Sequence, residues 1–340
     1  MTDLLSRYAE CLFWFGRYTE RAACLARVLE VQTSINRGTA DAETNWGWIL
    51  TLYDDHDQFA KLYEELSADA VARFYVIDRE NPDSLISSIR SGRENARTLR
   101  AVISTELWHQ VNSFYNRFRN LPTVALTPGR LSPTCQMVKK ECYAQLGVAE
   151  ATLYRDSAWR FFLLGVLVER ADQTSRLLDV RFAKRRVGGG DSRTLGDFGF
   201  WSVLLRSAAA QQAFLRETPG ARDPESVARF LILDPGLPRS VAFSVSEIDR
   251  VLNELRQQFH LRAGTGALEQ IDILRENLAV ASDDEALIDR LHEFNDSIQK
   301  QLIVFTEELS YAFFGTDRPA AQSQQSQMSG NGQSQSQSSS

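Results

Sequence analysis

The feature that most constrains this chain is a helical segment that occurs twice. Residues 13–32, "FWFGRYTERAACLARVLEVQ", align without a gap with residues 162–181, "FLLGVLVERADQTSRLLDVR". Eight of the twenty aligned positions are identical, whereas unrelated sequences would share about one at typical residue frequencies. Both segments carry apolar residues at three- and four-residue spacing, which indicates buried helices. The sequence therefore predicts a duplicated helical unit, with copies near 4–36 and 153–186.

A glycine precedes the repeated Glu-Arg pair by about one helical turn in each copy. Gly16 stands four residues before Glu20, and Gly165 stands four residues before Glu169. Glycine inside a helix costs roughly 1 kcal/mol relative to alanine, so its recurrence predicts a close approach by another backbone, a side chain or a ligand. Helical side chains lean toward the N-terminus, which places each carboxylate over the turn that holds the glycine.

The charged residues of the repeat leave two interpretations open. Glu169 and Arg170 follow the apolar run "FFLLGVLV" of residues 161–168, so they are expected to be partly buried and to need partners. The two helices could exchange Glu–Arg pairs and so fix their register, or the charges could form a site for a ligand or partner. Arg27 and Arg176 lie seven residues after the glutamates, too far along the axis to bond them, and are expected to meet a neighbouring helix.

The remaining sequence predicts an all-α fold of long antiparallel helices in a bundle. Stretches such as "SVSEIDRVLNELRQQF" keep the helical spacing, and convincing alternating strands are absent. Segments rich in Pro, Gly, Asp and Ser predict the breaks at 80–84, 120–134, 185–196, 217–226 and 233–240. We expect one helical domain over residues 1–318. The Gln/Ser-rich tail, residues 319–340, has too few apolar residues to fold and is predicted to be disordered.

Composition and charge exclude several classes of function. The net charge of −6 arises from acidic and basic residues mixed along the chain, so no nucleic-acid partner is expected. The four cysteines have neither C-x-x-C spacing nor the density of a disulfide scaffold, which fits a reducing compartment. The longest apolar run falls far short of the ~20 residues that span a bilayer. The chain is therefore expected to be cytoplasmic, with no membrane partner.

A second group of charged and amide side chains lies in the stretch "IRSGRENARTLRAVISTELW". It comprises Arg90, Arg93, Glu94, Asn95, Arg97 and Arg100. Long basic side chains usually cover solvated helix faces. Alternatively, several guanidinium groups could cradle a ligand that carries carboxylate or phosphate groups. Both interpretations stay open on the sequence alone.

Signatures of catalysis are sparse. The chain has no G-x-S-x-G elbow, no P-loop and no G-x-G-x-x-G after a strand. One E-x-x-H pattern and a less complete D-x-x-H match could, together with the repeated glutamates, supply the ligands of a di-iron helical bundle. These residues are Glu20, Glu106, His109, Glu169, Asp289 and His292. Ferritin-like proteins use two full E-x-x-H copies, and a metal site does not need an arginine after each glutamate. We therefore expect no metal and no cofactor.

Four separated stretches carry a resemblance to a known family. They are "LSRYAECLFWFGRYTERAACLARVLEV", "NPDSLISSIRSGRENARTLRAVISTELWHQVN", "ERADQTSRLLDV" and "LPRSVAFSVSEI". Together they resemble the alpha-E family, an all-helical bacterial domain of unknown function with a Glu-Arg motif. The resemblance extends to about residue 315. It implies a helical fold and a genomic neighbourhood that includes a circularly permuted ATP-grasp protein, a transglutaminase-like protease and, in some genomes, a proteasome-related peptidase.

We therefore expect a non-catalytic helical partner or ligand-binding module. The resemblance implies that it works with the ATP-grasp and transglutaminase-like proteins in peptide synthesis or processing. The alternative is an enzyme that uses Glu20 and Glu169 as acid–base or metal-ligating carboxylates. The candidate binding residues are Glu20, Arg21, Arg27, Arg93, Glu94, Asn95, Arg97, Glu169, Arg170 and Arg176. The sequence leaves the ligand and the oligomeric state open.

Overall fold

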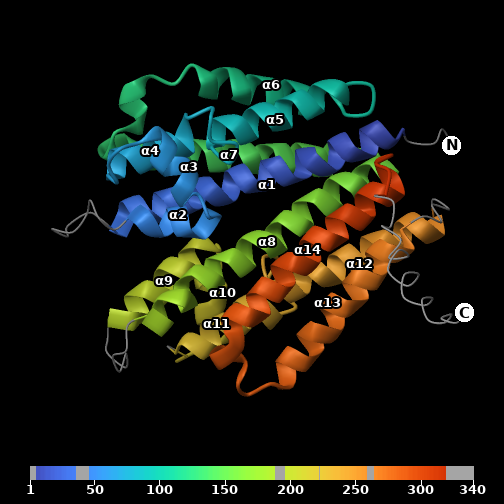
Figure 1. Cartoon of the computed structure of the whole chain (residues 1–340). Coiled ribbons are helices and arrows are strands. Elements are labelled where there is room, and N and C mark those ends of the chain that lie inside the picture. The colour runs from blue at the N-terminus through green and yellow to red at the C-terminus, as the bar shows by residue number, and fades with distance from the viewer. Residues whose placement is uncertain (1–4, 36–45, 188–195, 222, 259–263, 319–340) are drawn as a thin grey trace, which may run out of the picture.

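The structure, a computed structural model, describes residues 5–35, 46–187, 196–221, 223–258 and 264–318. Within these residues the chain forms helices and no strand (Figure 1), which confirms the predicted all-α fold. The first half consists of α1 (Ser6–Ile35), α2 (Gly47–Tyr53), α3 (His56–Leu62), α4 (Ala68–Val76), α5 (Leu85–Thr98), α6 (Thr105–Arg119), the 3₁₀ turn η2 (Thr123–Leu126) and α7 (Pro128–Thr152).

The second half begins with another long helix. It consists of α8 (Ser157–Val187), α9 (Gly196–Ser207), α10 (Gln211–Glu217), α11 (Pro224–Leu233), α12 (Val241–Gln258), α13 (Thr265–Asp283), the 3₁₀ turn η3 (Leu287–Arg290) and α14 (Leu291–Phe313). The tail predicted to be disordered, residues 319–340, lies outside the described residues.

The second half repeats the first, element by element. In each half the first helix packs against the fifth and the seventh, and the sixth packs against both of those. The halves meet where α1 crosses α8 (Figure 1), and each half also sends its second helix onto the long helix of the other, α2 onto α8 and α9 onto α1. The sequence predicted copies only near 4–36 and 153–186. The structure extends the duplication across almost the whole helical region.

Local geometry supports the duplication where the sequences have diverged. The second helix of each half is followed within two residues by a non-glycine residue in the left-handed region, Asp54 with φ 57° and Ala209 with φ 55°. In both turns the next residue's N–H donates to the carbonyl oxygen five positions back, at 2.9 and 2.7 Å. The edge-to-face aromatic pair that follows is also repeated, Phe59 with Phe74 at 5.3 Å and Phe214 with Phe230 at 5.4 Å.

The fifth helix of each half is preceded by an N-capping serine that makes the same two hydrogen bonds. Ser84 precedes α5, and its hydroxyl donates to Asp78 O at 2.5 Å and accepts from a backbone N–H three residues on. Ser240 precedes α12 and does the same, donating to Asp234 O at 2.5 Å. Such capping satisfies an N–H that has no partner within the helix and holds the preceding loop. These two loops also carry charged residues into the centre of the molecule.

The two repeated glycines lie at the crossing of α1 and α8. A Cβ atom added to Gly16 would stand 2.3 Å from Phe162 O, and one added to Gly165 would stand 1.9 Å from Phe13 O. These contacts are reciprocal, because Phe13 and Phe162 are themselves equivalent positions of the repeat. The predicted close approach is therefore made by backbone. It brings the two Glu-Arg segments together.

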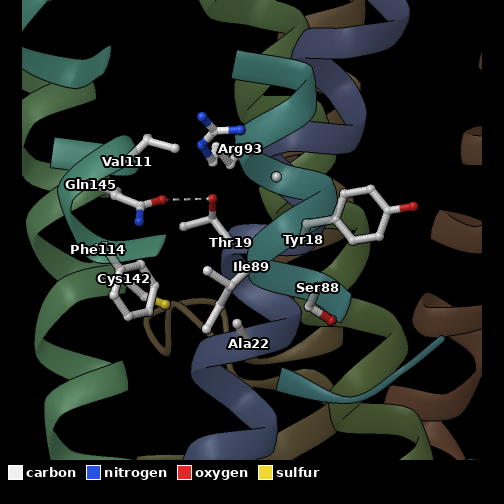
Figure 2. A pocket seen from close by; sticks show the side chains of 11 residues that line it. Tyr18, Thr19, Ala22, Ser88, Ile89, Arg93, Val111, Phe114, Cys142 and Gln145 are labelled. Carbon is white, nitrogen blue, oxygen red and sulfur yellow. Dashed lines mark hydrogen bonds between the residues drawn. The ribbon is translucent and has the colours of Figure 1, made fainter. Parts of the chain in front are cut away.

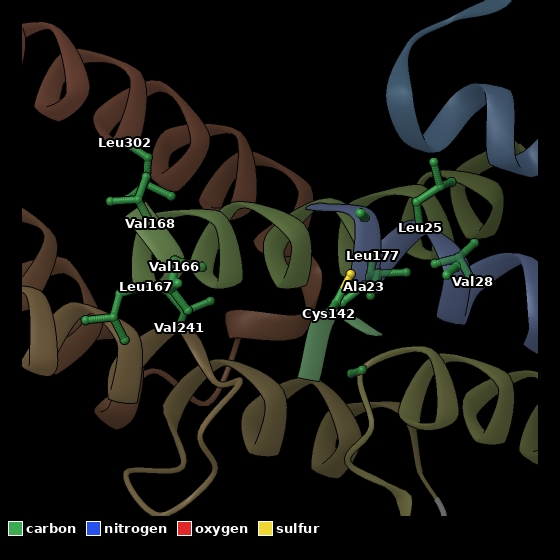
Figure 3. Packing of buried hydrophobic residues seen from close by; sticks show 14 of the residues in the cluster. Ala23, Leu25, Val28, Cys142, Val166, Leu167, Val168, Leu177, Val241 and Leu302 are labelled. Carbon is green, nitrogen blue, oxygen red and sulfur yellow. The ribbon is translucent and has the colours of Figure 1, made fainter. Parts of the chain in front are cut away.

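Packing on all sides explains why the run 161–168 of α8 is apolar around the helix. In Figure 3, Val168 lies beside Leu302 of α14, while Val166 and Leu167 lie toward Val241 of α12. All five of these residues are buried. A helix enclosed by neighbours has no solvated face, so apolar residues follow one another without periodicity.

One predicted break is shorter than expected. The sequence placed it at 120–134, but α7 already begins at Pro128 and contains Pro133. A proline at the first helical position needs no N–H donor, so Pro128 starts the helix rather than delaying it. Separately, no helix in the described part of the chain is both long and apolar enough to cross a membrane.

Candidate functional site

Glu169 of α8 is held by two arginines of α1. Its side chain is fully buried, with Arg17 Nε at 2.7 Å from Oε2 and Arg21 Nε at 2.7 Å from Oε1. Gln173, one turn further along α8, donates to Oε1 at 3.1 Å. Arg21 also reaches Asp83, in the loop before α5, at 2.7 Å. The carboxylate of one copy is thus bound by the guanidinium groups of the other.

Glu20 of α1 is held in the reciprocal way. Arg170 of α8 places Nε 3.2 Å from Oε2, and Arg239, in the loop before α12, places a terminal nitrogen 2.5 Å from Oε1. The thiol of Cys24 donates to the same Oε1 at 3.5 Å. The Glu20 side chain is fully buried as well. Of the two interpretations that the sequence left open, the structure shows the exchange of Glu–Arg pairs between the helices.

Both glutamates are held as carboxylates by this arrangement. Burial on its own would raise their pKa values, because it removes water from the charged form. At Glu20 the guanidinium groups of Arg239 and Arg170 outweigh burial and lower the pKa to about 2. Arg21 and Arg17 likewise lower the pKa of Glu169. Neither group is therefore poised to exchange a proton near neutral pH.

The two later arginines of the repeat behave differently from each other. Arg27 meets neighbouring helices, as expected, donating to Tyr143 Oη of α7 at 2.6 Å and to Ser207 O of α9 at 3.4 Å. Arg176 instead binds Asp172 of its own helix, with Nε 3.0 Å from each carboxylate oxygen. The acid four residues earlier thus gives Arg176 a partner that the repeat did not predict, and the Arg176 side chain also lines a groove together with residues of α1 and α14.

A groove of about 440 Å³ opens beside the Glu169 half of this network. It runs between α1, α8 and α14. Its lining comprises Trp14, Arg17, Arg21, Asp172, Arg176, Leu302, Ile303, Thr306, Glu307, Ser310, Tyr311 and Thr316. The guanidinium of Arg17 lies 5.2 Å from the ring centre of Trp14, a cation–π contact. The groove therefore combines charge, hydroxyl groups and apolar surface.

The candidates in the middle motif lie apart from this network, on α5. Arg93 donates to Asn112 at 2.9 Å and pairs with Glu94, which also pairs with Arg97. Arg97 and Arg100 are exposed, and Asn95 is half-buried. The cavity beside Arg93 (Figure 2) has a volume of about 10 Å³ open to the centre of a water molecule, and its lining is largely apolar. Such a space suits a single water rather than a ligand.

The residues of the di-iron alternative are not brought together. His292 contacts Asp179 and is 46% exposed at its side chain, whereas Glu20 and Glu169 are enclosed by arginines. Within the described residues, no group of three or more His, Cys, Asp or Glu side chains could hold a metal ion. The arrangement favours ion pairing at both glutamates over metal ligation.

Several members of the network were not among the sequence candidates. They are Arg17, Asp83, Tyr143, Asp172 and Arg239. All but Tyr143 stand in one of the four stretches that carry the family resemblance, but the role of each depends on which helices cross. Asp83 and Arg239 could have been found by aligning "NPDSLISSI" with "LPRSVAFSV", where they occupy matched positions before the fifth helix of each half.

Comparison with known proteins agrees with the geometry. A family model described as a predicted alpha-helical domain with a conserved ER motif matches residues 4–314, and the chain belongs to this family, Alpha-E. Uncharacterized proteins of Mycobacterium bovis and Mycobacterium tuberculosis are each 22% identical over 264 residues, which is 72% of this chain and 29% of theirs. The match thus spans less than a third of these relatives. No solved structure matches the chain significantly.

Proposed function

We propose that this protein is a non-catalytic docking module that binds a segment of a partner polypeptide in the groove between α1, α8 and α14. The observation that carries the proposal is the groove itself. Arg17 uses Nε for Glu169, and among the described residues its terminal nitrogens have no hydrogen-bond partner. Beside them stand Trp14, Ile303 and Tyr311. In this proposal, acidic side chains of the bound polypeptide pair with the terminal nitrogens of Arg17, and its apolar side chains pack against Trp14, Ile303 and Tyr311.

The enzyme alternative has less support. An acid or base needs a pKa near the working pH and access to substrate. Glu20 and Glu169 are fully buried, and arginines hold their carboxyl groups ionised. The same pairs fix the register of α1 and α8. In our proposal the two glutamates therefore have a structural role, and the groove beside them binds the partner polypeptide.

The proposed partners are an ATP-grasp protein and a transglutaminase-like protein of a peptide-making or peptide-processing system. The family resemblance suggests them. The mycobacterial relatives give further support, because the matched region is 29% of their length and is therefore joined to other sequence in the same chain. A domain that works beside others within one polypeptide in some proteins can work beside separate chains in others.

Co-purification of the full chain at native expression, followed by mass spectrometry, tests the proposal. Ile303→Asp changes an exposed residue of the groove, and Val280→Asp changes an exposed residue of α13 that does not line it. We expect the unmodified chain and Val280→Asp to retain an ATP-grasp or transglutaminase-like protein, and Ile303→Asp to lose it. Absence of both partners from the unmodified chain, or equal capture by Ile303→Asp, would overturn the proposal.

A further inference from the structure

The two halves of the central network differ in charge. Around Glu169 three arginines face three carboxylates: Arg17, Arg21 and Arg176 against Glu169, Asp83 and Asp172. Around Glu20 three arginines face one carboxylate: Arg27, Arg170 and Arg239 against Glu20. The Glu20 half therefore carries a surplus of two positive charges. Uncompensated charge away from water is costly, so such a surplus calls for a counter-charge.

Substitutions at equivalent positions of the duplication produce this surplus. Asp172, which neutralises Arg176, corresponds to Ala23 in the first copy, four residues before Arg27. Asp83, in the loop before α5, corresponds to Arg239 in the loop before α12. Compared with the surroundings of Glu169, those of Glu20 thus lack two acids and have one additional base. Valine at the position equivalent to Arg17, residue 166, removes one cation and leaves the net excess at two.

Within the described part of the chain, neighbouring groups do not supply the missing negative charge. Glu141 and Glu30, the next carboxylates on α7 and α1, already pair with Arg117 and Lys139. Burial raises the pKa of the Cys24 thiol, which keeps it neutral. Ser207 O, at the C-terminal end of α9, accepts from Arg27 and contributes the partial negative charge of a helix end, about half a unit. More than one positive charge stays unbalanced.

We propose that the cluster of Arg27, Arg170, Arg239 and Tyr143 is a binding site for a phosphate group. A phosphate group carries about two negative charges and three oxygens that accept strong hydrogen bonds from guanidinium forks. The cluster borders solvent, because Tyr143 is 45% exposed and the side chains of Arg170 and Arg239 are partly exposed. This inference goes beyond the proposed docking function, because it gives the module a second ligand, an anion, at a different site.

Titration calorimetry with inorganic phosphate tests the site, with ionic strength held constant by chloride. We expect one phosphate per chain. Arg27→Met removes one surplus charge, and Ala23→Asp places a carboxylate where the second copy has Asp172, so each should weaken binding at least tenfold. Arg250→Met removes an exposed arginine that pairs with Glu247 and Glu254 on α12. This control should bind phosphate as tightly as the unmodified chain.

Two results would overturn the site: no phosphate binding by the unmodified chain, or unchanged binding in a folded Arg27→Met or Ala23→Asp variant. A parallel titration with malonate checks the ligand class, since binding of malonate in place of phosphate would overturn the phosphate assignment. Partner capture by the unmodified chain keeps the two proposals apart. An unmodified chain that retains its partner without binding phosphate refutes this site alone, whereas one that binds phosphate but captures no partner refutes the docking function alone.

Discussion

At the scale of single residues, sequence and structure agree on the glutamates and differ on their partners. Matched spacing made the exchange of arginines between the helices of Glu20 and Glu169 one of the two interpretations that the sequence left open. It could not predict Arg239, which reaches Glu20 from a loop more than 200 positions later. Periodicity describes one helix at a time. The remaining partners depend on how α1 and α8 cross and on which loops approach the crossing.

The charge difference between the halves predicts unequal costs for removing the two carboxylates. Glu169→Gln leaves Arg17 without a charged partner, but Arg21 retains Asp83. Glu20→Gln leaves its arginines with no carboxylate at all. Breaking a buried pair typically costs about 3–5 kcal/mol. We expect Glu169→Gln at the lower end of that range and Glu20→Gln at the upper end.

Urea unfolding in a phosphate-free buffer measures this difference in the free energy of unfolding. Phosphate must be absent because a bound anion would partly replace the lost carboxylate. Equal losses for the two variants, or a larger loss for Glu169→Gln, would contradict the charge count around Glu20. Unfolding free energies unchanged by either substitution would mean that the buried pairs contribute nothing to the stability of the fold.

At the scale of elements, the long helices were predictable and the short ones were not. Helices such as α1, α8, α12 and α14 carry several turns of regular apolar spacing, so their existence follows from pattern alone. Helices of seven residues, such as α2 and α3, hold too few turns to establish a period. Their positions are set by tertiary contacts, including the contact of α2 with α8.

The crossing of α1 and α8 predicts the effect of adding one methyl group. Gly16→Ala and Gly165→Ala would each place Cβ inside the van der Waals distance of a backbone carbonyl, which cannot rotate away. The helices must then separate, and overpacking of this kind typically costs about 1–3 kcal/mol. Gly147→Ala on α7 is the matched control, because nothing lies within 4 Å of its added Cβ.

Thermal and urea unfolding should separate the three alanine variants. Both crossing variants should be destabilised, while Gly147→Ala should be neutral or more stable by up to about 1 kcal/mol, since alanine favours the helix. If Gly16→Ala and Gly165→Ala match the Gly147→Ala control, the two helices do not approach as closely as described.

At the scale of the whole molecule, the duplication was only partly predictable. The two long helices retained visible identity, because the crossing requires the two glycines and the exchanged ion pairs require the glutamates and arginines. In α2–α4 and α9–α11 the equivalent residues changed freely within the limits of burial. Asp55 and Tyr75, which are hydrogen-bonded to each other, correspond to Ala210 and Leu231. In these segments the duplication is recognised from the shared backbone geometry and packing, and not from the sequence.

The duplication predicts how the chain responds to being divided. The link between the halves is short, and Tyr154 within it is 83% exposed, so a cut after this residue removes no buried contact. Fragments 1–154 and 155–340, when co-expressed, should associate one to one. Each fragment alone should fold poorly, because it would expose a glutamate and the apolar crossing face that the other half covers.

Co-purification and circular dichroism of the fragments check this expectation, and Gly165→Ala in the second fragment should weaken the association. Two fragments that fold separately and stay monomeric would mean that each half has a sufficient core of its own. Such a result would make the crossing a contact between two independent domains. Glu20 and Glu169 are placed reciprocally, and among the described residues each forms its ion pairs with arginines of the opposite half or its loops, which argues instead that neither half neutralises its own buried charge.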